Sequence, residues 1–128
     1  MQKALVNRLL SDSTLSGLIG TKLFPENVPQ SIELPACYYM SDNNPPQYCD
    51  NGTAVIAGVF TVVAYARTKT GVMSIADAIT ARLSRYSGTL ESEKIEFCQW
   101  SNSQDDYDEQ NRVFIRECNF DVTYIKQL

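Results

Sequence analysis

Residues 55–86 contain the feature that most constrains the fold, a fully apolar strand pattern followed by a helical one. Residues 55–66 read VIAGVFTVVAYA and are apolar at both alternating sets of positions. One set comprises Val55, Val59, Val63 and Tyr65, and the other comprises Ile56, Phe60, Val62 and Ala64. Because a half-solvated strand alternates apolar with polar residues, this pattern predicts a strand that is central in its sheet and covered on both faces.

The hydrophobic period changes after the short polar joint RTKT. In residues 71–86 apolar side chains recur every three or four positions, at Val72, Ile75, Ala76, Ile79, Leu83 and Tyr86. This spacing predicts an amphipathic helix of about four turns, capped by Thr70 and ended by residues 87–88. Such a helix covers one face of the sheet. The opposite face then needs another cover, either the N-terminal segment or another subunit.

The remaining segments complete an α+β pattern. Residues 2–11 predict a short amphipathic helix, and a further turn or two, capped by residues 12–14, ends at Gly20. Strands are predicted at residues 36–41, 95–101 and 112–125, with a possible short edge strand at 22–24. Together they predict a single domain over residues 1–128, with a four-stranded, mainly antiparallel sheet, one long helix packed on a face and a short N-terminal helical segment, in the order α-β-β-α-β-β.

Two of these strands predict which side chains face the core. In residues 112–125 the even positions Phe114, Cys118, Phe120, Val122 and Tyr124 are apolar, while the odd positions from 117 to 123 are polar. This alternation predicts a half-exposed strand. Strict alternation in residues 95–101 places Ile95, Phe97 and Gln99 on one face and Glu96, Cys98 and Trp100 on the other.

Composition argues against catalysis, metal binding and binding to nucleic acid. The chain has no histidine, and its four cysteines form no CxxC pair, so no usual zinc site, no cofactor and no enzyme is predicted. We expect the cysteines to be reduced, mainly in the core. Net charge is −4, with seven basic against six acidic residues in residues 1–90 and four against nine in residues 91–128. This balance, without a basic stripe, disfavours gripping nucleic acid phosphates.

Targeting signals are not apparent in the sequence either. No segment approaches 18 uninterrupted apolar residues, and the N-terminus has no long apolar run after its basic residues. We therefore expect no signal peptide, no membrane span and no membrane partner, and a protein made in the cytoplasm or in something assembled there.

Two polar segments stand out as candidate interfaces. Residues 42–52, DNNPPQYCDNG, predict a surface loop around Tyr48 that is mobile alone and ordered by a partner. Residues 104–111 predict an acidic loop, which lacks the glycine and the bidentate glutamate of a calcium-binding EF-hand loop. The candidate interface residues are Tyr48, Asp105, Asp106, Tyr107, Asp108 and Glu109.

The order and character of several segments resemble the tail completion, or tail terminator, proteins of long-tailed bacteriophages and prophages. These segments are LVNRLLSDSTLSGLIGTKLFP, VPQSIELPACYYM, GVFTVVAYA followed by SIADAITARL, and a final hairpin ending in VFIRECNFDVTYI. The resemblance implies a structural α+β subunit that forms a ring, commonly a hexamer, which caps the tail tube and joins it to the head connector. Its partners would be copies of itself, the tail tube protein and the head-tail connector protein. It would be located in the virion, and in the host cytoplasm during assembly.

An alternative from another class is a small cytoplasmic ligand-binding or regulatory domain, with the N-terminal helix closing the second face of the sheet. The acidic loop also has three interpretations. In a ring it faces the lumen, where an acidic wall lets DNA slide without binding it, or it docks on a basic partner surface, or it is a solvated hairpin tip without a role.

Overall fold

The computed structural model describes residues 1–90 and 92–128. Within them the chain forms three helices, α1 (Gln2–Leu10), α2 (Ser13–Ile19) and α3 (Lys69–Leu83). It also forms the seven strands of one sheet, β1 (Leu23–Pro25), β2 (Ala36–Asn43), β3 (Gln47–Tyr48), β4 (Thr53–Ala66), β5 (Tyr86–Leu90), β6 (Glu93–Asp108) and β7 (Val113–Gln127). The predicted α+β class is confirmed, but this part of the chain has seven strands rather than four.

The sheet is mixed and mostly antiparallel. Its order is β1-β2-β4-β7-β6-β5, and the short strand β3 is a third partner of β4. The pair β1 and β2 is parallel, and the other pairs are antiparallel. Since β4 pairs with β2 along one edge and with β7 along the other, the predicted central position of residues 55–66 is confirmed.

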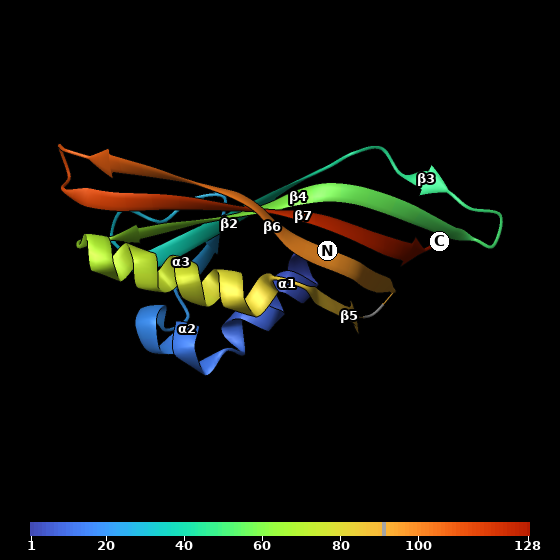
Figure 1. The fold of residues 1–128 in the computed structure, drawn as a ribbon, viewed down its shortest axis with the longest axis horizontal. Helices are drawn as coiled ribbons and strands as arrows, with labels where there is room; N and C mark the ends of the chain where they lie inside the picture. Colours follow the sequence, from blue (N-terminus) through green and yellow to red (C-terminus); the bar gives the residue numbers. More distant parts are fainter. Residues whose placement is uncertain (91) are drawn as a thin grey trace.

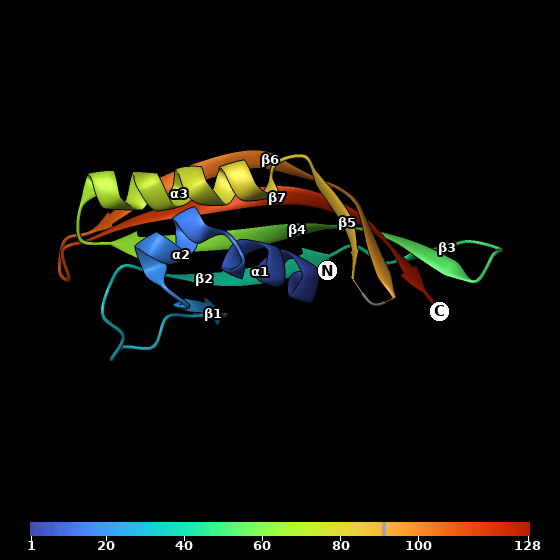
Figure 2. The same cartoon turned by 90° about the horizontal axis from the view of Figure 1, so that it is seen from below.

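All three helices lie on the same face of the sheet. α3 packs against β4 and β7, and α1 and α2 pack against α3 (Figures 1 and 2). The sequence left two possible covers for the second face, the N-terminal segment or another subunit. The N-terminal helices do not cover it. On that face of β4, Val63 is only 2% exposed whereas Val59 is 37% exposed. The prediction of cover on both faces holds at one end of β4 and is wrong in its middle.

The hydrophobic core lies between the helices and the sheet. Its largest fully buried side chains include Phe60, Phe120, Leu5, Leu9, Ile75, Ile79 and Leu83. On β7 the even positions from 118 to 124 are buried and Phe114 is half-buried, so the predicted alternation of this strand is confirmed. The contribution of α3 through Ile75, Ile79 and Leu83 is also as predicted.

The ends of α3 differ from the prediction. The N-cap is Thr68, whose hydroxyl oxygen accepts a hydrogen bond from the Gly71 amide at 3.0 Å, and not Thr70. The helix ends before Ser84, which is extended, and Arg85 has a φ of +63°. Tyr86, predicted as the last helical residue, is the first residue of β5, and residues 87–88 continue that strand. By contrast, α2 has the predicted cap at Asp12 and ends at Gly20.

β6 carries two β-bulges that change which side chains face the helices. The register with β7 shifts between Ile95 and Phe97 and again between Trp100 and Asn102. Because Glu96 is an extra residue in the first bulge, Ile95 and Cys98 are both buried on the helix side. The predicted faces of Phe97 to Trp100 are confirmed relative to one another, but Ile95 lies on the side of Cys98 and Trp100 and not with Phe97, so the predicted division is wrong across this bulge.

The polar segment predicted as a loop over residues 42–52 is partly strand. β2 continues to Asn43, opposite Gly58, and β3 lies within the segment. A β-carbon at Gly58 would lie 2.6 Å from the carbonyl oxygen of Asp42, so a residue without a side chain is needed where β2 leaves β4. None of the helices within residues 1–90 and 92–128 has the length and hydrophobicity of a membrane-spanning segment.

Candidate assembly surfaces

The open face of the sheet, turned away from the helices, displays the alternate side chains of β2, β4, β7 and β6. Cross-strand partners share a face. The register therefore places Glu117 of β7 beside Val63 of β4, Asn119 beside Thr61 and Asp121 beside Val59. The middle of this face is thus polar and acidic around an exposed valine. In a sheet with one solvated face, the alternate positions that point away from the core carry such polar residues.

A hydrogen-bonded ladder crosses the open face from β4 to β6. The hydroxyl of Thr61 donates to Oδ1 of Asn119 at 2.7 Å, and Nδ2 of Asn119 donates to Oδ1 of Asn102 at 2.8 Å. The same Nδ2 also donates to Oε2 of Glu117 at 3.1 Å. These bonds tie three neighbouring strands together by side chains as well as by backbone, which fixes the polar centre of the face.

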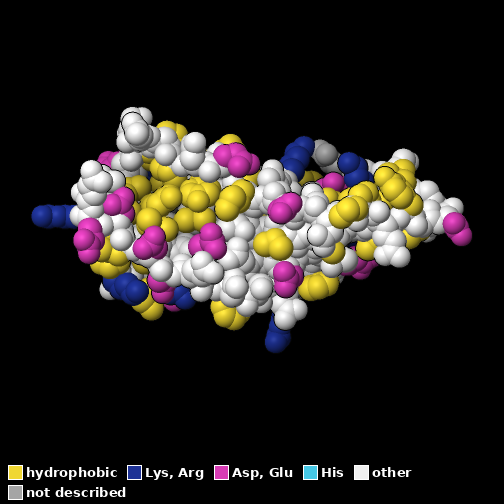
Figure 3. Space-filling view, turned by 90° about the horizontal axis from the view of Figure 1, so that it is seen from above, with side chains coloured by type: hydrophobic (Ala, Val, Ile, Leu, Met, Phe, Trp, Pro, Cys, Tyr) yellow, Lys and Arg dark blue, Asp and Glu magenta, His cyan; other side chains and the backbone are white. Residues whose placement is uncertain are grey.

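At one end of the open face a loop folds over the sheet and leaves a groove. Residues 26–34 are held by the Glu26 amide, which donates to the Tyr39 carbonyl at 2.9 Å, and they end at a cis peptide bond between Leu34 and Pro35. The groove has a volume of about 650 Å³. Its apolar lining includes Val28, Ile32, Leu34, Tyr65, Val113 and Ile115. Figure 3 shows apolar side chains gathered in a hollow of this face.

The groove also has polar groups at its rim. The ring of Tyr65 lies 5.8 Å from that of Tyr38, and burial, with smaller effects of Tyr38 and Asp108, raises the pKa of Tyr65 to about 12. Its phenol therefore stays neutral and serves as a hydrogen-bonding group on an apolar wall. Arg67, exposed at the other side, donates from Nη1 to the Asn111 carbonyl at 2.7 Å.

The acidic segment at residues 104–111 is the end of the β6–β7 hairpin and not a loop as predicted. β6 continues to Asp108, and only residues 109–112 form the turn. Strand pairing divides the acidic side chains between the two faces, with Asp105 and Tyr107 on the helix side and Asp106 and Asp108 on the open side. These residues together with the turn are called the acidic tip below.

Local partners hold three side chains of the acidic tip in place. Asp105 lies 3.5 Å from Nη1 of Arg116 and 3.9 Å from Nζ of Lys69, and the Tyr107 ring lies 4.6 Å from that of Phe114. Asp108 accepts hydrogen bonds from the Asn111 side chain at 2.8 Å and from the Gln110 and Asn111 amides. These bonds lower the pKa of Asp108 below its ordinary value, and the bonds from Asn111 have the largest effect. Asp106 accepts a hydrogen bond from the Tyr107 amide at 2.8 Å, and in the described part of the chain neither Asp106 nor Glu109 makes an ion pair.

The segment of residues 44–52, called the arm below, projects at the other end of the molecule (Figure 1). It contains β3, whose Gln47 and Tyr48 pair with Val55 and Ala54 of β4. The turn into β4 uses Gly52 at a φ of +81°, a backbone conformation that favours glycine. Tyr48 is 69% exposed, more than any other large hydrophobic side chain of the described chain except Leu128.

The structure therefore does not bring the six predicted interface residues together. Tyr48 lies on the arm, while Asp105, Asp106, Tyr107, Asp108 and Glu109 lie at the opposite end, on the acidic tip (Figures 1 and 2). The apolar groove beside the tip was not predicted. A signal for it existed in Tyr65, which the strand pattern of residues 55–66 directs away from the helix, and in the prolines that frame residues 25–35.

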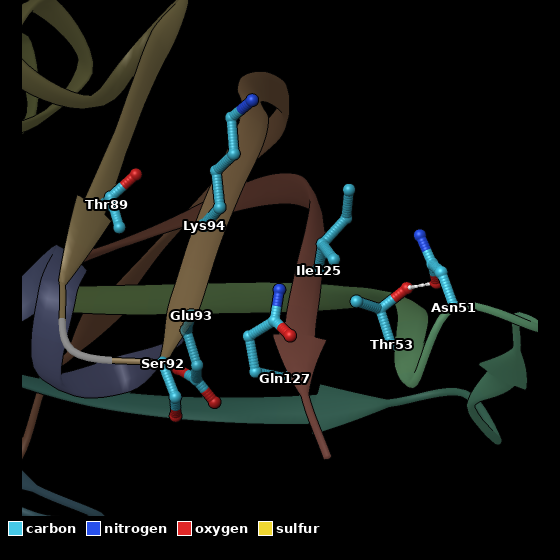
Figure 4. A pocket seen from close by; sticks show the side chains of 8 residues that line it. All are labelled: Asn51, Thr53, Thr89, Ser92, Glu93, Lys94, Ile125 and Gln127. Carbon is cyan, nitrogen blue, oxygen red and sulfur yellow. Dashed lines mark hydrogen bonds between the residues drawn. The ribbon is translucent and has the colours of Figure 1, made fainter.

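A second hollow, of about 360 Å³, lies near the arm (Figure 4). It is lined by Asn51, Thr53, Thr89, Ser92, Glu93, Lys94, Ile125 and Gln127. The side chains of Thr53 and Asn51 hydrogen-bond to each other, and Lys94 points away from Gln127. The polar side chains around the hollow do not converge on a common point (Figure 4), so they do not form a site for a small molecule.

The described residues hold no group of three side chains able to bind a metal ion. Three cysteines are buried and free, and burial raises the pKa of Cys37 and Cys98 to about 12 and also raises that of Cys118. Neutral buried thiols are unreactive, which confirms their interpretation as core residues. Cys49, on the arm, is exposed.

Comparison with known proteins identifies the family. Residues 3–125 match the family described as Tail completion protein gp17. The chain belongs to this family. The tail completion family is a structural family of phage virion tails, so the predicted non-catalytic class and the predicted place in the virion tail are confirmed.

A solved structure supports the fold of this tail completion protein. It is described as "Virion of native gene transfer agent (GTA) particle", and one of its chains is similar with a TM-score of 0.74. The two chains are 16% identical, and the similarity covers 97% of this chain and 93% of that chain. At this identity the similarity shows the fold alone. No curated protein sequence matches the chain.

Proposed function

We propose that this tail completion protein forms a ring that caps the tail tube and joins it to the head connector. Six subunits are expected in the ring. The observation that carries the proposal is the open face of the sheet, with all three helices on the opposite side. Its exposed apolar residues, Val59 at 37% and Phe97 at 43%, together with the groove, form the kind of surface that subunit contacts bury.

The alternative, a ligand-binding domain closed by its N-terminal helix, is not supported by this arrangement. α1 and α2 lie beside α3 on the helix side, and the groove is open to solvent rather than enclosed. Family membership favours assembly over ligand binding in the same way.

The ring is tested in phage particles and with the isolated protein. Deleting the gene should leave heads and tails that do not join, and supplying the protein should restore joined particles. The purified protein, examined at high concentration by mass measurement and electron microscopy, should show rings with a central hole. Joined particles in the deletion strain would contradict the proposed function.

Within the ring, the acidic tip faces either the lumen or a basic partner surface. Since Asp105 is paired with Arg116 and Lys69, the groups available for either role are Asp106 and Glu109. The variant Asp106→Asn/Glu109→Gln separates the roles. Slower joining with weaker dependence on salt indicates docking on a basic surface, whereas normal joining with impaired DNA ejection indicates the lumen. Normal yield and infectivity would leave the tip as a solvated turn.

A further inference from the structure

We propose that the arm of one subunit inserts into the groove of the next subunit around the ring. The inference rests on the proposed ring and identifies the contact that closes it. A contact between two different surfaces of identical chains is head-to-tail, and repeated head-to-tail contacts generate a ring when the rotation closes. Each subunit then offers one arm and receives one arm.

The arm needs a partner to bury its apolar group. All its residues are exposed, and its only strand pairing is the two-residue contact of β3 with β4. Tyr48 is 69% exposed at its centre. A two-residue strand adds no core of its own, and a projecting tyrosine is among the side chains that most often anchor a protein interface.

The groove supplies the apolar surface that Tyr48 lacks. Val28, Ile32 and Ile115 are half-buried along its walls, and the ring of Tyr65 is available for an aromatic contact. A tyrosine entering such a groove loses most of its water contact and can stack offset or edge-to-face on the second ring. The groove is open, so a segment of backbone can follow the side chain into it.

Charge is complementary across the same contact. Asp50 lies two residues after Tyr48, and Arg67 stands at the groove rim. Within residues 1–90 and 92–128 neither side chain makes an ion pair, and Arg67 donates only to a backbone carbonyl. An arginine with free N–H groups is suited to a two-point contact with a carboxylate. Placing Tyr48 in the groove therefore also brings the Asp50 carboxylate to Arg67.

The positions of the two surfaces exclude a contact within one chain. The arm lies at the end of the molecule where β3 is labelled, and the groove lies at the end that carries the β6–β7 turn (Figures 1 and 2). An arm therefore reaches a groove only in another copy. Two different surfaces that cannot meet within one chain are suited to a head-to-tail contact between copies.

A cross-linking experiment uses the exposed thiol of the arm. Of the four cysteines, all in the described part of the chain, Cys49 alone is exposed. The variant Gln30→Cys adds a thiol at the groove, where Gln30 is exposed. Particles carrying this variant, oxidised with copper phenanthroline and run on a non-reducing gel, should give a ladder of linked subunits that ends at the number in the ring.

Two control variants make the ladder specific. Gln30→Cys combined with Cys49→Ser should give no ladder, and Ser16→Cys, on the exposed side of α2, should give nothing beyond dimers. Joined particles in which Gln30→Cys gives no more cross-linking than Ser16→Cys would overturn the arm contact while leaving the ring intact. Cross-links from Cys49 to a tube or connector protein would overturn it as well.

Charge reversal tests the predicted partner of Asp50. In the Gln30→Cys background, Asp50→Arg and Arg67→Asp should each lower the yield of the ladder about tenfold or more, and the two together should restore it. Unchanged thermal midpoints of the isolated variants confirm that they fold. Full ladders in both single variants would contradict the inference.

Discussion

The two faces of the sheet are built from the same strands, yet adjacent residues on one strand differ sharply in burial. Phe60 of β4 points to the helices and is 0% exposed, while its neighbour Val59 points the other way and is 37% exposed. On β7 the buried Phe120 is followed by the exposed Asp121. The helix side specifies the fold of the domain, and the open side is left free to carry the polar and apolar groups on which the proposed assembly rests.

The largest expected difference between the faces comes from neighbouring truncations on β4. Phe60→Ala should lower the free energy of unfolding by about 3–5 kcal/mol, because it leaves a cavity in the core. Val59→Ala should change it by about 0.5 kcal/mol or less. Urea unfolding of the isolated protein measures both, and similar losses for the two variants would contradict the assignment of the faces.

The helix that covers the sheet gives the next effect. Ile79→Ala on the buried side of α3 should cost about 2–5 kcal/mol of unfolding free energy. Met73 lies on the exposed side of the same helix, so Met73→Ala should be nearly neutral. An unchanged unfolding midpoint for Ile79→Ala would place this side of α3 outside the core.

A smaller effect tests how α3 begins. Thr68→Ala removes the hydroxyl that accepts from the Gly71 amide and should cost about 1 kcal/mol. Thr70→Ala, two residues inside the helix, provides the matched control and should not destabilise the protein. If the two substitutions had the same effect in urea unfolding, Thr68 would not be the cap.

The smallest effect concerns the acidic tip. Since hydrogen bonds lower the pKa of Asp108 in the folded protein, its ionised form contributes stability above the carboxyl pKa of the unfolded chain. This contribution is lost as pH falls through the lower, folded pKa. The difference in unfolding midpoint between wild type and Asp108→Ala should therefore be present at neutral pH and fade below about pH 4. Gln110→Ala, at an uncharged exposed residue of the same turn, is the control and should show no such trend.

Alternation predicted much of this division from the sequence, because burial on one face leaves a period of two. Residues 112–125 show it, and the core residues of β7 followed directly, as those of α3 did from the helical spacing. Residues 55–66 are apolar at both sets of positions, so their pattern predicted the central place of β4 but not which of its faces is open. Tyr86 was misplaced because it continues the helical spacing of Leu83, while the chain turns through Arg85 at positive φ without a glycine to mark the end.

The candidate site was less predictable, because it depends on contacts between distant segments. A run such as DDYD has low strand propensity, but pairing with β7 and the ion pairs of Asp105 hold it in β6. The groove is formed by residues 26–34 together with β4 and β7. No local pattern reports that these segments meet.

The paired bulges of β6 act like two compensating frameshifts. Each bulge adds one unpaired residue. The side chains that face the helices are therefore Ile95, then Cys98 and Trp100, and then the odd positions from Ser103 to Tyr107. Deleting Glu96 removes a residue that the ladder does not pair and keeps every side chain in phase. Deleting Gln99, which pairs with Asp121, puts the side chains on one side of the gap out of phase as far as the next bulge. We expect β6 to tolerate deletions at its two bulges but not at the positions between them.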